Sequence, residues 1–66
     1  MWSDELQEET REYFNRMPFA FVKQIGGKGG VCTLKDGIYI IIDREDDSEV
    51  VFESMDALIE ANWAID

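Results

Sequence analysis

The dipeptide Asp36-Gly37, set between two apolar segments, constrains the fold of this chain more than any other feature. Asp-Gly is a strong signal for a two-residue type I′ hairpin, because both central positions of that turn need a positive φ angle. The flanking segments, Val31–Lys35 and Ile38–Asp43, are rich in the residue types that favour strands. The turn therefore predicts an antiparallel hairpin with the opposite pairs Lys35–Ile38, Leu34–Tyr39 and Cys32–Ile41.

A third strand, Glu49–Glu53, is expected after an acidic turn. If Asp46-Asp47 forms that turn, Ile41 faces Phe52 and Ile42 faces Val51. Alternation along the strands then divides the side chains between two faces of the sheet. One face consists of Cys32, Leu34, Tyr39, Ile41, Val50 and Phe52. The other consists of Val31, Thr33, Ile38, Ile40, Ile42 and Val51. Both faces are apolar at their centre.

A helix is predicted toward each end of the chain. Ser3 caps the first helix, which ends near Arg16 because Pro18 disfavours helical backbone in the residue before it. Its apolar stripe consists of Leu6, Thr10, Tyr13, Phe14 and Met17. Ser54 caps the second helix, which is expected to run to Trp63.

The segment Phe19–Ile25 is compatible with two structures. Its aromatic residues and the alternation of Phe19 and Phe21 favour a strand. A helix that begins at Pro18 and ends at Gly26 also fits the spacing, and we prefer the strand. The expected architecture is α+β: a small antiparallel meander of three to four strands, flanked by an N-terminal and a C-terminal helix. Residues 1–66 are expected to form a single domain.

Composition excludes several classes of function. Fifteen acidic residues oppose six basic ones, giving a net charge of -9, which disfavours binding of nucleic acid by a basic surface. Histidine is absent, so imidazole-based catalysis and histidine-ligated metals are excluded. A chain of this size has little volume for a dry catalytic pocket beside its core. We therefore expect no enzyme, no catalytic residue and no cofactor.

Two segments carry partial ligand motifs. Asp43–Glu49 holds five carboxylates with the early spacing of a calcium loop, but Ser48 and Ser54 stand where that loop needs its glycine and its last glutamate. Gly26–Gly30 has the glycine content of a phosphate-binding loop. However, Lys28 is not followed by Ser or Thr as in the Walker pattern, and a strand follows the loop instead of a helix. The first segment is interpreted as a solvated turn, and the second as a mobile hairpin loop or a close backbone contact.

The single cysteine and the hydropathy of the chain bear on its surroundings. Cys32 falls on the face expected to be packed, so we expect a buried, unreactive thiol. The longest apolar run, Ile38–Ile42, is far shorter than the roughly 20 residues of a membrane-spanning helix. The first residues are acidic, whereas a signal peptide begins with basic ones. These features predict a cytoplasmic protein without membrane contact.

The segment Phe52–Asp66 reads FESMDALIEANWAID and follows both a glycine-rich loop and an Asp-Gly hairpin. In this it resembles small uncharacterised bacterial proteins, some of them carried on mobile elements. The shared pattern is structural, a last strand that leads into a capped helix. The resemblance implies a bacterial origin and no particular activity.

The apolar sheet carries the main expectation about function. If both helices cover one face, they leave exposed a row formed by Ile38, Ile40, Ile42 and Val51. If each helix covers one face, the chain is a self-sufficient monomer. We prefer the first arrangement, because a chain this short without a disulfide or a metal is marginally stable alone. It predicts a non-enzymatic interaction or accessory module that forms a homodimer, built sheet to sheet or edge to edge, or binds another protein.

The acidic composition allows a second function. Glu5, Glu8, Glu9 and Glu12 recur along one side of the first predicted helix. Together with the Asp43–Glu49 turn they would imitate the charge of a nucleic acid. The alternative is therefore an acidic mimic that inhibits a basic DNA-binding or DNA-cutting protein.

Overall fold

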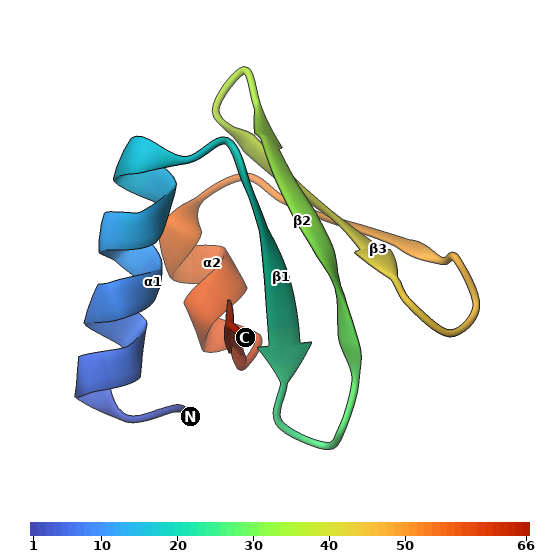
Figure 1. Cartoon of the computed structure of the whole chain (residues 1–66), viewed down its shortest axis with the longest axis horizontal. Coiled ribbons are helices and arrows are strands. Elements are labelled where there is room, and N and C mark those ends of the chain that lie inside the picture. Colours follow the sequence, from blue (N-terminus) through green and yellow to red (C-terminus); the bar gives the residue numbers. More distant parts are fainter.

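Two helices pack on one side of a five-stranded antiparallel sheet in the computed structural model, which describes residues 1–66 (Figure 1). The elements along the chain are α1 (Asp4–Arg16), β1 (Phe19–Gln24), β2 (Gly29–Lys35), β3 (Ile38–Asp43), β4 (Glu49–Phe52), α2 (Met55–Glu60) and β5 (Trp63–Ile65). The strand order β4-β3-β2-β1-β5 contains the expected meander. The α+β class is confirmed, and the sheet has one strand more than the largest number expected.

The hairpin between β2 and β3 forms as the sequence predicts. Asp36 and Gly37 have φ angles of 54° and 79°, the signs that a type I′ turn requires. The three predicted pairs, Lys35–Ile38, Leu34–Tyr39 and Cys32–Ile41, are all present.

The register between β3 and β4 differs from the prediction. The pairs are Ile41–Val50 and Ile42–Glu49, whereas a turn at Asp46-Asp47 predicts Ile41–Phe52 and Ile42–Val51. The backbone N–H of Asp43 donates to the carbonyl of Ser48 at 2.8 Å. This hydrogen bond closes a loop of four residues between them, in place of the predicted two-residue turn at Asp46-Asp47. The difference amounts to two residues, so each side chain stays on its predicted face of the sheet.

The first helix and the first strand follow their sequence signals. The Ser3 hydroxyl accepts a hydrogen bond from the N–H of Leu6 at 3.2 Å, and α1 ends at Arg16. The segment after Pro18 is a strand, the preferred of the two interpretations, and β1 pairs antiparallel with β2.

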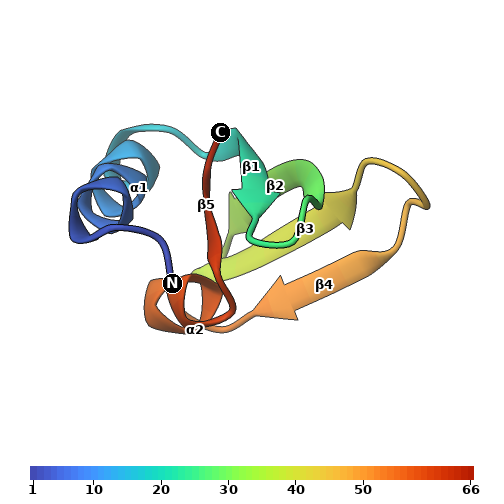
Figure 2. The same ribbon diagram turned by 90° about the horizontal axis from the view of Figure 1, so that it is seen from below.

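The second helix is shorter than predicted. It ends at Glu60 instead of Trp63, because Asn62 adopts a left-handed φ of 69° that an α-helix cannot contain. The last residues, Trp63–Ile65, form β5 and pair with the otherwise free edge of β1. Figure 2 shows β5 between the two helices and β1.

The core lies between the helices and one face of the sheet. It consists of Phe14, Ala20, Val22, Cys32, Ile41, Leu58, Ile59 and Trp63. The ring of Phe14 on α1 meets that of Tyr39 on β3 edge to face, with 5.5 Å between the centroids. Neither helix has the length and apolar character needed to cross a membrane.

Candidate interaction surface

The face of the sheet that points away from the helices is apolar and uncovered. We call it the open face, and its apolar residues are Phe19, Phe21, Val31, Ile38, Ile40, Ile42 and Val51. Strand pairing assembles them in rows across the sheet. Phe19, Thr33, Ile40 and Val51 form one row, and Phe21, Val31 and Ile42 form the next. Four neighbouring strands therefore contribute to one apolar surface.

The four residues singled out from the sequence lie together on the open face. Ile38, Ile42 and Val51 are exposed, and Ile40 is half-buried in the row between Thr33 and Val51. Strand alternation and pairing place them on one face, and both helices cover the other one, as the preferred arrangement requires. The structure thus places these side chains in one patch.

Two phenylalanines extend this patch beyond the row derived from the sequence. Phe21 is 61% exposed and Phe19 is 47% exposed, so they are among the most exposed large apolar residues of the chain. Their alternation is visible in the sequence, but their face depends on the register between β1 and β2. Because Gly29 and Gly30 belong to β2, the connecting loop is shorter than the glycine-rich segment suggests. That register pairs Phe21 with Val31.

Charge is distributed unevenly between the two sides of the molecule. The acidic residues of α1 are all exposed and lie across the core from the open face: Asp4, Glu5, Glu8, Glu9 and Glu12. Around the open face the register places Lys35 at one end of the strands, and Lys23 and Arg44 at the other. Glu49 stands at the β4 edge. The five acidic residues of α1 therefore lie away from the apolar patch, whereas Asp36 and the Asp43–Glu49 turn lie at the ends of its strands.

A groove of about 580 Å³ lies beside the loop that joins β1 to β2. It is lined by Met1, Trp2, Lys23, Gln24, Ile25, Gly26, Gly27, Lys28 and Arg44. No acidic residue lines it. Its walls therefore concentrate positive charge in a strongly acidic protein.

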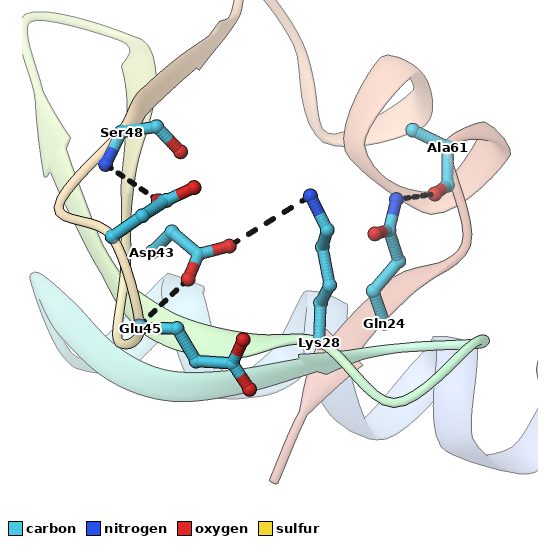
Figure 3. A network of polar contacts seen from close by, with 7 residues as sticks. Gln24, Lys28, Asp43, Glu45, Ser48 and Ala61 are labelled. Carbon is cyan, nitrogen blue, oxygen red and sulfur yellow. Dashed lines mark hydrogen bonds and ion pairs between the residues drawn. The ribbon is translucent and has the colours of Figure 1, made fainter.

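The acidic turn after β3 uses its carboxylates locally (Figure 3). Asp43 is 6% exposed, accepts a hydrogen bond from the N–H of Glu45 at 2.8 Å, and lies 3.9 Å from Lys28 Nζ. The Asp46 carboxylate accepts from the N–H of Ser48, and this hydrogen bond lowers its pKa. Nowhere do three or more carboxylate or thiol side chains converge as ligands for one metal ion.

The two parts of the proposed nucleic-acid mimic lie apart. Figures 1 and 2 place α1 and the turn between β3 and β4 at opposite ends of the molecule. Asp43, the first residue of that turn segment, is also buried. The acidic helix and the acidic turn therefore do not form one continuous charged surface.

Cys32 is completely buried at the centre of β2, as expected from its face. Desolvation raises the pKa of its thiol to about 12. The thiolate is the reactive form of cysteine, so this residue packs as a small hydrophobe.

Comparison with protein-family models, with curated proteins and with solved structures yields no match.

Proposed function

We propose that this protein is a non-enzymatic interaction module that self-associates through its open face. The observation that carries this proposal is the exposure of Phe21, 61%, within a contiguous apolar surface. A single exposed apolar residue is ordinary in a monomer, whereas a contiguous apolar patch is typical of an interaction site. Here four neighbouring strands contribute to the patch.

The area of the open face suits a modest protein interface. Strands about 4.8 Å apart that rise about 3.3 Å per residue give four strands of six residues a flat area of about 400 Å². Projecting side chains increase the accessible area beyond this value. A standard interface buries about 800 Å² on each partner, and weaker ones bury less. Two open faces in contact therefore fit a reversible dimer better than an obligate one.

The charge distribution favours a second copy as the occupant. Two chains of -9 repel each other most strongly where their acidic helices meet. Contact through the open faces keeps both copies of α1 on the outside, far from the interface. The rim of the open face carries both signs, with Lys35 and Lys23 at its ends and Glu49 at one edge. Contact through the open faces thus keeps the five carboxylates of α1 in one copy apart from those in the other.

The small size of the chain gives self-association an energetic role. A domain of about 60 residues buries only about 60% of the surface that its unfolded chain exposes. This chain has neither a disulfide nor a cluster of metal ligands to stabilise it. Covering Phe19, Phe21 and Val51 in a dimer removes further apolar area from water and stabilises the fold.

Two neighbouring valines of β4 provide a matched test. Val51 is 51% exposed on the open face, and Val50 is 38% exposed on the side of the helices. We compare the wild type, Val51→Lys and Val50→Lys by sedimentation equilibrium at micromolar concentrations. The wild type and Val50→Lys are expected to give about twice the chain mass of 7.6 kDa, and Val51→Lys the mass of one chain.

The contrary results are equally distinct. A wild type that sediments as a single chain at these micromolar concentrations contradicts self-association. A Val51→Lys variant that stays dimeric contradicts the open face as the interface and favours pairing along the free edge of β4. Circular dichroism of both variants shows whether a change in mass accompanies loss of the fold.

A further inference from the structure

The groove at the β1–β2 loop contains basic side chains that are hardly neutralised by carboxylates. Lys23, Lys28 and Arg44 are half of the six lysines and arginines of the chain, and no carboxylate lines the groove with them. Neither Lys23 nor Arg44 has a carboxylate within ion-pair distance. Lys28 has one partner, Asp43, at a long 3.9 Å, and its own side chain is 61% exposed. This long pair joins the exposed ammonium group of Lys28 to a buried carboxylate, so the outward side of the ammonium group stays open to a second ligand.

Gly29 makes room for the guanidinium group of Arg44. A Cβ atom built at Gly29 would overlap Arg44 Nη2, so the guanidinium group occupies space that a larger residue at this position would take. Gly29 pairs directly with Lys23 on β1. The guanidinium group of Arg44 and the ammonium group of Lys23 therefore lie on the same part of the sheet. A bound anion stabilises two such neighbouring positive charges.

The loop itself offers backbone donors. Gly26 and Gly27 have φ angles of 110° and 99°, values that glycine adopts without strain. The N–H of Gly27 donates to the carbonyl of Gln24, but the N–H groups of Gly26 and Lys28 form no hydrogen bond. The N–H groups of Gly26 and Lys28, one on each side of the paired Gly27 N–H, are therefore free to donate to a bound ligand.

Trp2 forms a fixed aromatic wall of the same groove. Its indole N–H donates to the carbonyl of Asn62 at 2.7 Å, and its own carbonyl accepts from the side chain of Gln7 at 2.8 Å. The ammonium group of Lys23 lies 5.1 Å from the centre of the indole ring, a cation–π contact. Trp2 therefore orders Lys23 and closes one side of the groove.

We propose that this groove binds a phosphate group between Lys23, Lys28, Arg44 and the loop amides. Phosphate presents three acceptor oxygens in different directions, which matches donors that surround a groove better than a planar carboxylate does. The chemistry fits inorganic phosphate and the phosphate group of a mononucleotide whose base packs on Trp2. This inference does not depend on self-association.

Nuclear magnetic resonance of the ¹⁵N-labelled full chain tests the site. Inorganic phosphate and adenosine monophosphate are titrated separately at pH 7.5, with sodium chloride at equal ionic strength as the reference. We expect saturable shifts of the Gly26 and Lys28 amides and of the Arg44 side-chain Nε–H. If the nucleotide binds more tightly and shifts the Trp2 indole N–H, the ligand is a phosphate ester of a nucleoside. If both bind with equal affinity, the ligand is free phosphate.

Two substitutions each remove one positive charge, one at the groove and one away from it. Arg44→Gln is expected to weaken phosphate binding about tenfold, whereas Lys35→Gln, at the opposite end of β2, leaves it within about twofold. Repeating the titration on Val51→Lys separates binding from self-association. Three results would overturn the proposal: shifts that do not saturate, shifts that chloride reproduces, and shifts that both substitutions reduce equally. The dispersion of the amide spectrum verifies that each variant is folded.

Discussion

Thr10 joins the first helix to the last strand through one hydroxyl group. Its side chain is completely buried, donates to the carbonyl of Leu6 at 2.8 Å, and accepts from the N–H of Ile65 at 3.1 Å. In the sequence Thr10 belongs to the apolar stripe of a helix, which predicts burial but not a hydrogen-bond partner 55 residues away. The partner belongs to β5, a strand that the sequence pattern does not reveal.

Replacement of Thr10 by valine is therefore expected to destabilise the protein although the shape of the side chain is kept. The N–H of Ile65 loses its acceptor inside the core, which costs about 1–3 kcal/mol of the free energy of unfolding. Thr10→Ser keeps the hydroxyl and loses one methyl group, a cost of about 1 kcal/mol. Urea denaturation measures both values. A valine variant as stable as the wild type would show that this hydrogen bond contributes nothing.

Burial of Cys32 makes the stability of the protein depend on pH in the alkaline range. The pKa of the thiol rises from its ordinary 9.0 to about 12 in the folded chain. Below pH 9 the thiol is protonated in both states and contributes no pH dependence. Between pH 9 and 12 only the unfolded chain loses the proton, so the free energy of unfolding falls as pH rises, by at most about 1.4 kcal/mol per pH unit.

Cys32→Ala separates this contribution from those of other alkaline groups. The stability difference between wild type and variant is expected to shrink as pH rises from 8 to 11, when both are unfolded with urea. In the native protein at pH 8, Cys32 should react with Ellman's reagent only through unfolding. A constant difference, or a rapid reaction of the native protein, would contradict the burial of the thiol.

Local signals decide which elements are predictable from this sequence. The β2–β3 hairpin and α1 are specified within a few residues, by Asp36-Gly37 and by Ser3 together with Pro18. The β3–β4 register is not specified by such a local signal, because it depends on the hydrogen bond from the Asp43 N–H to the Ser48 carbonyl. Three residues are too few for a recognisable strand pattern, so β5 is defined only by its pairing with β1.

The same distinction applies to the candidate site. Alternation in the predicted hairpin suffices to group Ile38, Ile40, Ile42 and Val51 on one face. The contribution of the two phenylalanines of β1 requires the β1–β2 register. The basic groove gathers Trp2, Lys23 and Arg44 from distant parts of the chain, which no local pattern relates.

Asn62 decides where α2 ends and β5 begins. Its φ of 69° is tolerated by asparagine and glycine, whereas a β-branched residue resists it. We expect Asn62→Val to lower the free energy of unfolding by about 1–2 kcal/mol, and Asn62→Gly to change it by less than about 0.5 kcal/mol. Glu60→Val, in the last turn of α2, measures the cost of a valine at helical φ. Equal losses for the two valine variants would refute the role of the left-handed conformation.

The asymmetry of charge governs how the whole molecule responds to salt. Two chains of -9 repel each other, and this repulsion weakens as the Debye length falls from about 20 Å at 0.02 M salt to about 6 Å at 0.3 M. Self-association through the open face should therefore strengthen severalfold over this range, as followed by sedimentation. An acidic mimic bound to a basic partner shows the opposite response. Dimerisation that weakens with salt would mean that ion pairs hold the copies together.

The most direct test of the open face uses nuclear Overhauser effects between differently labelled copies. One copy carries ¹³C-labelled isoleucine methyl groups, and the other is unlabelled. We predict intermolecular signals from the methyl groups of Ile40 and Ile42 to phenylalanine rings of the second copy, and none from the buried Ile41 and Ile59. Intermolecular signals that arise only from residues outside the open face, or no such signals at millimolar concentration, would contradict the account.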